Sequence, residues 1–259
     1  MILPLGGMIC AIFFLGYILR NTTDKPVQKS GPEKSSPAEE LIAAAEKGDY
    51  LLVKYLLSKK ADCNYQGKNG KTALTAAAAH NRIECLKILL QAGADTELRD
   101  KLDNSALVLA AERNHPKILQ LLLKYNADIN GGSRSGKTAL QAAAKAGSRN
   151  ALLLLLKHKA ALWPGSSEGR GALITALLNK HENIAIILLA AGADPNECDT
   201  AGNSALILAA GNGYIKCVEM LLNNAAVNRS HCNKSGENAL DWAIKNNHTV
   251  IVDLLKKVQ

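Results

Sequence analysis

The chain has 259 residues, of which 47% are hydrophobic, 4% aromatic and 21% charged, and its formal net charge is +8. This apolar fraction excludes a chain that is disordered throughout, and six cysteines are too few for a disulfide-rich scaffold. Because Phe and Trp number only two each, the core must be built from Ala, Leu, Ile and Val. The basic balance permits anionic partners but does not indicate a fold.

The N-terminal residues 1–19 contain no charged side chain. As a helix they would be roughly 28 Å long, close to the ~30 Å thickness of the bilayer hydrocarbon. We therefore expect residues 1–20 to form a single-pass transmembrane signal-anchor. The basic residues on its C-terminal side are Arg20, Lys25, Lys29 and Lys34. The positive-inside rule then predicts that the rest of the chain lies in the cytoplasm.

A cleaved signal peptide is the alternative interpretation of residues 1–20, and it would place the folded domain in the periplasm or outside the cell. No Lys or Arg precedes the apolar stretch, and no A-x-A-like cleavage site follows it. After the apolar stretch, residues 21–35 are rich in Pro, Ser, Lys, Asn and Thr, which predicts a flexible linker.

A 33-residue period covers the rest of the chain, 36–259. Leucines recur at this spacing, with a last step of 34 residues: Leu41, Leu74, Leu107, Leu140, Leu173, Leu206 and Leu240. A row of alanines keeps the same period: Ala61, Ala94, Ala127, Ala160, Ala193 and Ala226. Two independent rows predict seven units, near 36–67, 68–100, 101–133, 134–166, 167–199, 200–233 and 234–259.

Each unit has the same predicted interior. Small residues follow the repeat leucine by three and four positions and allow close helix packing. A residue that tolerates positive φ follows it by seven positions and predicts the end of a first helix: Gly48, Asn81, Asn114, Gly147, Gly213 and Asn247. An apolar second helix comes next, and Ser36 to Glu39 form a predicted capping box at the start of the first unit. Cys85 and Cys217 fall at second-helix positions that we expect to be buried.

These units resemble the ankyrin repeat over about residues 36–259. The family pattern T-P-L-H-x-A-A is matched by Thr72-Ala73-Leu74 with Ala77-Ala78, and Thr138-Ala139-Leu140 matches it again. Ala replaces the family Pro, and the family His is absent at its usual position, so the resemblance does not imply the hydrogen bonds of that histidine here. The resemblance implies an all-α solenoid of helix-turn-helix units with hairpin loops. It also implies a protein–protein interaction scaffold that is not an enzyme and needs no cofactor, metal or nucleic acid.

The same resemblance places partner binding on the hairpin tips and on the exposed last turn of each first helix. The residues at these positions that we expect to bind a partner are Lys68, Lys71, Arg99, Lys101, Leu102, Arg113, Arg134, Lys137, Lys145, Trp163, Arg170 and Lys245. Their charge predicts a partner protein with an acidic surface; the alternative is an ordinary solvated surface. Trp163 is either an exposed anchor for the partner or a ring that packs onto its irregular neighbour unit.

Residues Gly131 to Thr138 match the phosphate-binding pattern G-x-x-x-x-G-K-T and give an alternative from the enzyme class, a nucleoside triphosphatase. The Gly-Lys-Thr-Ala-Leu part, however, recurs at Gly70 to Leu74 as the repeat's own signature. We therefore favour a structural role for this segment. His115, His181 and His248 occupy equivalent positions and are expected to be capping or surface residues rather than metal ligands.

The fifth unit is the least regular. Gly171 replaces the usual Thr or Ser, Leu177 replaces an Ala, and Lys180 stands at the positive-φ position. We expect local opening of the domain to be easiest there.

Overall fold

The computed structural model describes residues 36–133, 136–162 and 171–257. The predicted anchor 1–20, the predicted linker 21–35 and the candidate residues Arg134, Trp163 and Arg170 lie outside the described residues. Within the described ranges, no helix has the length and apolar character needed to cross a membrane.

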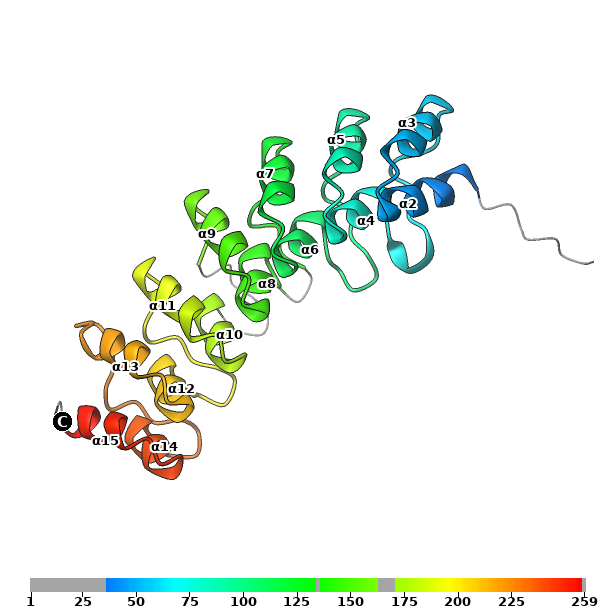
Figure 1. Cartoon of the computed structure of the whole chain (residues 1–259). Coiled ribbons are helices and arrows are strands. Elements are labelled where there is room, and N and C mark those ends of the chain that lie inside the picture. Colours follow the sequence, from blue (N-terminus) through cyan, green and yellow to red (C-terminus); the bar gives the residue numbers. More distant parts are fainter. Residues whose placement is uncertain (1–35, 134–135, 163–170, 258–259) are drawn as a thin grey trace, which may run out of the picture. The chain divides into compact units, whose positions relative to one another are not determined.

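The described residues form fourteen α-helices in seven successive pairs (Figure 1). In chain order the pairs are α2 (Pro37–Lys47) with α3 (Tyr50–Ser58), α4 (Ala73–Ala79) with α5 (Ile83–Gln91), α6 (Ala106–Glu112) with α7 (Pro116–Lys124), α8 (Ala139–Ala146) with α9 (Arg149–Lys157), α10 (Ala172–Leu178) with α11 (Glu182–Ala190), α12 (Ala205–Asn212) with α13 (Ile215–Leu222), and α14 (Ala239–Lys245) with α15 (Thr249–Lys256). A short 3₁₀ turn, η1 (Lys68–Gly70), lies in the first connecting loop. The described part contains one isolated β-bridge, Cys198 to Ser204, and no strand, so the all-α prediction is confirmed.

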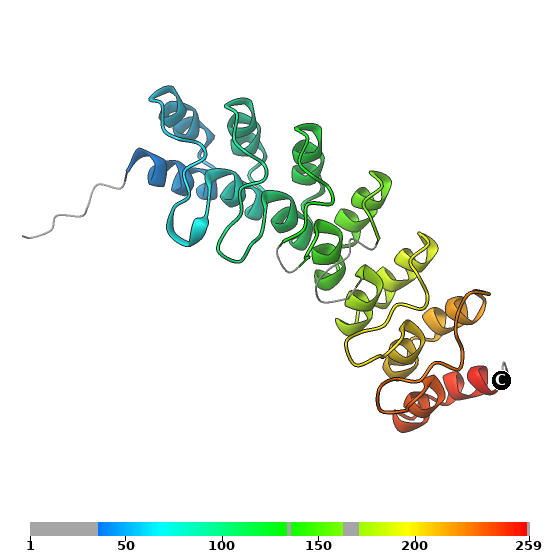
Figure 2. The same cartoon turned by 180° about the vertical axis from the view of Figure 1, so that it is seen from behind.

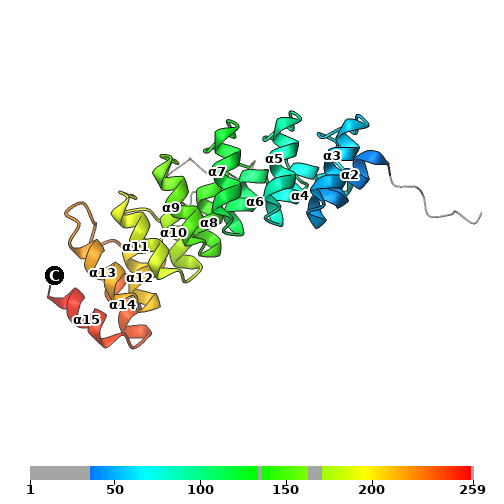
Figure 3. The same cartoon turned by 45° about the horizontal axis from the view of Figure 1, so that its top comes forward.

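The pairs stack in chain order. Each first helix packs against the first helix of the next pair, from α2 and α4 through to α12 and α14. The second helices form a parallel row from α3 to α15, and three views of the molecule show both rows (Figures 1, 2 and 3). The two helices of each pair therefore contact mainly each other and the helices of the neighbouring pairs, as in other solenoids.

The alanine positions explain why the first helices can lie so close together. Ala77, Ala110, Ala143, Ala176 and Ala209 are all completely buried. The six predicted core leucines from Leu41 to Leu206 are at most 2% exposed, while Leu240, in the last described helix pair, is half-buried. A larger side chain at the alanine positions would force the helices apart, which costs stability. The scarcity of aromatic residues is thus a packing requirement.

The helix ends are where the sequence predicted them. Ser36 and Glu39 form the capping box of α2. The residue that ends each first helix has positive φ in all seven units: Gly48, Asn81, Asn114, Gly147, Lys180, Gly213 and Asn247. Lys180 adopts this conformation without the freedom of Gly or the tolerance of Asn, so the fifth unit carries some backbone strain.

A row of side chains bonds five of the units to the unit before them, and the sequence did not indicate this row. His115, His181 and His248 precede their second helices, as expected for capping positions, but their rings also reach back across the interface. Their Nε2 atoms lie 3.3, 3.0 and 3.1 Å from the carbonyl oxygens of Ala79, Lys145 and Gly211, respectively. A carbonyl oxygen only accepts, so each Nε2 carries a proton and donates it. Burial lowers the pKa of His115, which favours the neutral ring.

Arg82 and Ser148 occupy the same position in other units and make the same kind of bond. Arg82 Nε donates to the Glu46 carbonyl at 3.0 Å, and Ser148 Oγ donates to the Glu112 carbonyl at 2.9 Å. Carbonyls in the last turn of a helix have no partner within their own helix. The row therefore satisfies these acceptors while it ties neighbouring units together.

The first helix of the fifth unit, α10, begins without a capping side chain of its own. Its N-cap residue is Gly171, whereas Thr138 caps α8 and Ser204 caps α12 by accepting the N–H three residues later. The carboxyl group of Glu197, from the loop after α11, occupies this place instead. It accepts a hydrogen bond from the backbone N–H of Ile174, the third residue of α10.

Glu197 is only 5% exposed, and its Oε2 atom is buried without a hydrogen-bond partner. Burial, together with the nearby charge of Asp194, raises the pKa of Glu197 to about 7, while the bond from Ile174 lowers it. A Cβ atom on residue 171 would lie only 2.6 Å from the Glu197 Cδ atom. The glycine at 171 is therefore required by the carboxyl group that replaces its side chain.

The two cysteines at equivalent second-helix positions are buried, as predicted. Cys85 is 1% exposed and Cys217 is completely buried. Burial raises the pKa of both thiols, that of Cys217 to about 12, so they remain protonated and serve as small apolar side chains.

Candidate partner-binding surface

Nine of the twelve predicted partner-binding residues lie in the described part of the chain. Six of them are exposed: Lys68, Lys101, Leu102, Arg113, Lys145 and Lys245. Lys71, Arg99 and Lys137 are half-buried. Arg134, Trp163 and Arg170 lie outside the described residues, so the choice between an exposed and a packed Trp163 stays a prediction.

Leu102 is the most exposed large apolar side chain of the described residues, at 81%. The loop that carries it is nevertheless held firmly by its neighbours. The Asp100 carboxylate accepts hydrogen bonds from the N–H groups of Leu102 and Asn104, both at 2.9 Å. The N–H of Lys101 donates to the carbonyl of Asn69 in the preceding loop at 2.8 Å. An apolar side chain on a fixed loop loses little backbone entropy when it binds a partner.

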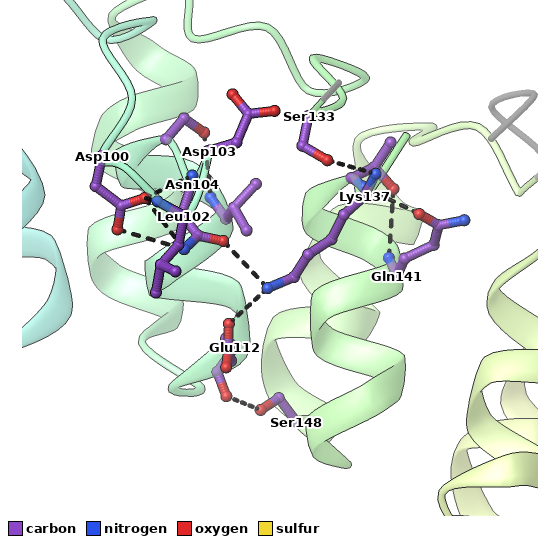
Figure 4. Close-up of polar contacts among 12 residues, drawn as sticks. Asp100, Leu102, Asp103, Asn104, Glu112, Ser133, Lys137, Gln141 and Ser148 are labelled. Carbon is purple, nitrogen blue, oxygen red and sulfur yellow. Dashed lines mark hydrogen bonds and ion pairs between the residues drawn. The ribbon is translucent and has the colours of Figure 1, made fainter. Parts of the chain in front are cut away.

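A chain of polar contacts connects this loop to the next unit (Figure 4). Asn104 is 5% exposed, and its Oδ1 atom accepts a bond of 3.1 Å from Lys137 Nζ. The same Nζ atom lies 3.0 Å from the Glu112 carboxylate, in the last turn of α6. Ser148 then donates to the carbonyl of Glu112. The position of the Leu102 loop is thus linked to the interface between α6 and α8.

Ion pairs neutralise part of the basic charge that the sequence placed on this surface. Lys71 Nζ lies 2.8 Å from the Glu46 carboxylate, and His80 Nε2 lies 3.2 Å from it. The hydrogen bond from Lys71 is the largest cause of the lowered pKa of Glu46. Lys245 Nζ lies 3.3 Å from the Glu237 carboxylate. With the pair at Lys137, three of the predicted basic contact residues already have an acidic partner. The surface is therefore less positive than the sequence suggests.

Lys101 and Arg113 form no ion pair within the described ranges, and they lie beside Leu102 at one hollow. This pocket has a volume of about 450 Å³ between the second and third helix pairs. Ala79 and Leu109 line it together with Lys101, Leu102 and Arg113. Asp100 also contributes, but it is occupied with the loop hydrogen bonds. The pocket combines apolar walls with two available cations, which suits an acidic peptide that also carries an apolar side chain.

A second, more open hollow of about 820 Å³ lies against the same loop. Residues 97–103 line it, with Gln66 on the preceding loop and Gly132 and Ser133 on the following one. Arg99 belongs to this hollow, where its Nη1 atom lies 3.4 Å from the carbonyl oxygen of Asp103. Leu102 and Lys101 line both hollows, so the loop tip is placed to contact a partner on either side.

In the phosphate-binding pattern, Lys137 and Thr138 are the residues that would bind a nucleotide and its magnesium ion. Both already form hydrogen bonds within the domain. Lys137 binds Glu112 and Asn104, and Thr138 is 2% exposed in the capping box of α8 with Gln141. Among the residues described, no group of three or more His, Cys, Asp or Glu side chains could hold a metal ion.

Comparison with protein families identifies the repeating unit. The model of ankyrin repeats matches the chain in three segments, residues 41–133, 131–199 and 188–258. The chain belongs to the ankyrin-repeat family. Ankyrin repeats form a protein–protein interaction module, so the chain carries such a module. No curated protein matches the chain significantly.

The sequence identified Lys101, Leu102 and Arg113 as exposed surface residues of the ankyrin domain, but it missed the acidic residues that modify this surface. Glu46 and Glu112 each precede their lysine by 25 residues, from Glu46 to Lys71 and from Glu112 to Lys137. This spacing follows from the repeat register, so it could have revealed both pairs. The hydrogen bonds of Asp100 depend on the path of one loop and gave no such signal.

Proposed function

We propose that the chain is a membrane-tethered scaffold with seven ankyrin repeats, one for each helix pair. Residues 1–20 anchor it, and the repeat domain lies in the cytoplasm. The domain binds an acidic protein partner through the loop tips and the ends of the first helices. The centre of the binding surface is the pocket of Lys101, Leu102 and Arg113.

The exposed Leu102 side chain is the observation that carries this proposal. An apolar side chain that is 81% exposed on a loop held by Asp100 has no packing role in the domain. Large apolar residues at the centre of an interface, with charged groups at its rim, supply much of the affinity of protein complexes. Lys101 and Arg113 would provide such a rim toward carboxylates of the partner.

Affinity capture with variants of the full chain tests the proposed surface. The substitutions Leu102→Asp and Lys101→Glu/Arg113→Glu should each abolish retention of the partner, because they remove the apolar anchor or repel its acidic groups. Lys117→Glu/Lys216→Glu is the matched control, since it reverses two exposed charges on the second helices α7 and α13. A protein retained equally by all four chains does not use this surface.

The proposed anchor is tested separately by the intact mass of the chain purified from its membrane fraction. An unprocessed chain supports the anchor. A chain shortened by about twenty residues contradicts it and supports the exported alternative.

A further inference from the structure

The second helix of the first pair, α3, carries an apolar surface that no described helix covers. Tyr50, Leu51 and Tyr55 on this helix are 48%, 65% and 57% exposed. α3 packs against α2 on one side and α5 on another. Because α3 begins the row of second helices in the described part of the chain, no described helix precedes it in that row (Figure 1).

The sequence at the position of Leu51 distinguishes α3 from the next five second helices, whereas α15 carries the apolar Val250 there, 53% exposed. The following five units carry polar residues there: Glu84, Lys117, Asn150, Asn183 and Lys216. All five are exposed, so this position faces solvent throughout the stack. Only the first of these six units places a leucine in it. Exposure of Tyr55 follows from its place at the end of the row, but the leucine at 51 is a departure from the repeat pattern.

Lysines surround this apolar surface. Leu51, Lys54, Tyr55 and Ser58 form one stripe along α3, because residues three and four positions apart share a helix face. Lys59 Nζ lies 5.6 Å from the centre of the Tyr55 ring. Exposed lysines also lie at the two ends of the helix, Lys47 and Lys60. Tyrosines, leucine and lysines together are the composition of helices that lie at a membrane interface.

The exposed acidic groups on the same two helices are few and partly occupied. Asp49 caps α3 by accepting from the N–H of Leu52 at 3.0 Å. Glu39 and Glu40 lie in the first turn of α2, where Glu39 takes part in the capping box. The Glu46 carboxylate binds Lys71 and His80. The stripe formed by Leu51, Lys54 and Tyr55 itself contains no acidic residue.

We propose that this surface of α3, Tyr50 to Lys59, docks on the headgroups of an anionic lipid bilayer. The domain begins at Ser36, so residues 1–35 connect the proposed anchor directly to the helix pair that carries this surface. Those residues hold four basic and two acidic side chains, a net charge of +2. Their net charge has the same sign as the lysines of α3, which disfavours their binding to this surface. A layer of anionic lipid headgroups has the opposite charge and is the occupant that we infer. Docking of α3 rests on the proposed membrane tether, but an experiment can contradict the docking without contradicting the tether.

The test uses the full chain in nanodiscs of phosphatidylcholine, with and without phosphatidylserine, and follows amide hydrogen exchange in residues 50–58. Exchange in α3 should be slower in the anionic discs than in the neutral ones, while exchange in α15 should be equal in both. Lys54→Glu/Lys59→Glu should remove the difference, because each lysine near an anionic surface contributes about a factor of five to the bound population. Leu51→Glu should also remove it, because it replaces the apolar side chain by an acidic one. The control Lys117→Glu/Lys216→Glu should keep it, because residues 117 and 216 are the counterparts of residue 51 in other units.

Equal exchange of α3 in neutral and anionic discs, or a difference that survives both α3 variants, overturns the proposal. The first of these results is also expected if residues 1–35 or a partner protein cover the surface instead. A chain that does not stay with the discs shows that the tether has failed. In that case flotation of the chain with phosphatidylserine vesicles decides the matter: binding that depends on Lys54 and Lys59 supports docking, and absence of binding overturns it.

Discussion

The first turns of α8 and α10 occupy the same position in the repeat, but different residues accept the backbone N–H group at the start of each helix. In α8 the Thr138 hydroxyl accepts the backbone N–H of Gln141, and Gln141 Oε1 accepts the backbone N–H of Thr138. In α10 the cap residue is Gly171, and Glu197 accepts the N–H of Ile174 from a loop 26 residues farther along the chain.

The difference shows that a helix start can be completed locally by neutral groups or at a distance by a titratable one. The hydroxyl of Thr138 has no charge to lose at ordinary pH, so its cap does not depend on pH. Glu197 is buried, and its ionised form pays a desolvation cost that the one hydrogen bond does not offset. The fifth unit therefore depends on pH in a way that the fourth does not.

The substitution Glu197→Gln should give the largest effect, and this effect should grow as the pH rises from about 4.5 through 7. The pKa of Glu197 is raised from 4.5 to about 7 in the folded state, so the protonated form is favoured by folding. The contribution of this group to stability is complete below about pH 4.5 and is lost as the pH rises through 7. Wild-type protein should thus lose roughly 3 kcal/mol between pH 4 and pH 8 through this group, and the neutral Gln should not. Denaturant unfolding at both values measures this.

The control for this prediction is Glu219→Gln, which changes an exposed carboxylate on α13. It should leave the difference between pH 4 and pH 8 as it is in wild type. If Glu197→Gln behaves like this control, the buried carboxyl group does not govern the pH dependence of the fifth unit.

The substitution Gly171→Ser restores a usual cap residue and should nevertheless destabilise the domain, by about 2 kcal/mol. Its Cβ atom would overlap the Glu197 carboxyl group, and overpacking of this kind costs about 1–3 kcal/mol. Gly171→Ser/Glu197→Ser should recover most of the loss, because the sixth unit carries Ser204 and Ser230 at the two equivalent positions. Chemical denaturation of the single and double variants measures the coupling; additive effects would contradict the overlap.

The substitution Thr138→Ala should cost about 1 kcal/mol, the usual value for loss of an N-cap side chain. In contrast to the effect at Glu197, this loss should be the same at pH 5 and pH 8, because no titratable group takes part. Unfolding curves at the two pH values measure it, and a loss that grows with pH would remove the contrast between the two caps.

Hydrogen exchange should show the smallest of these effects, a modestly faster opening of α10 and α11 than of α8 and α9 at pH 7. Half-ionised Glu197 and the positive φ of Lys180 both weaken the fifth unit. Uniform protection from the fourth to the sixth unit would contradict this expectation.

The sequence predicted the helix pairs because their determinants are local and periodic. Most units repeat the cap residue, the leucine, the small residues and the positive-φ residue at fixed offsets, so the register could be read from rows such as Leu74 and Leu107. The resemblance to the ankyrin repeat, applied in the same register, implied the exposed positions of Lys101, Leu102 and Arg113.

The contacts between units could be predicted only in part. The sequence singled out Gly171 as irregular, but the compensating Glu197 lies in a different loop, and its role requires knowledge of how that loop returns to α10. The histidine bonds to Ala79, Lys145 and Gly211 likewise depend on the distance between stacked helices. That distance is set by packing, and no single unit encodes it.

The contacts between neighbours also determine how far a local failure spreads. An opening at α10 and α11 divides the described helix pairs into four before it and two after it. About three repeats are needed for an independently stable array, so the block from α2 to α9 exceeds this size and the block from α12 to α15 falls short of it. We expect damage at the fifth unit to unravel the C-terminal end. The Leu102 loop and the lysine-rich surface of α3 belong to the block that survives.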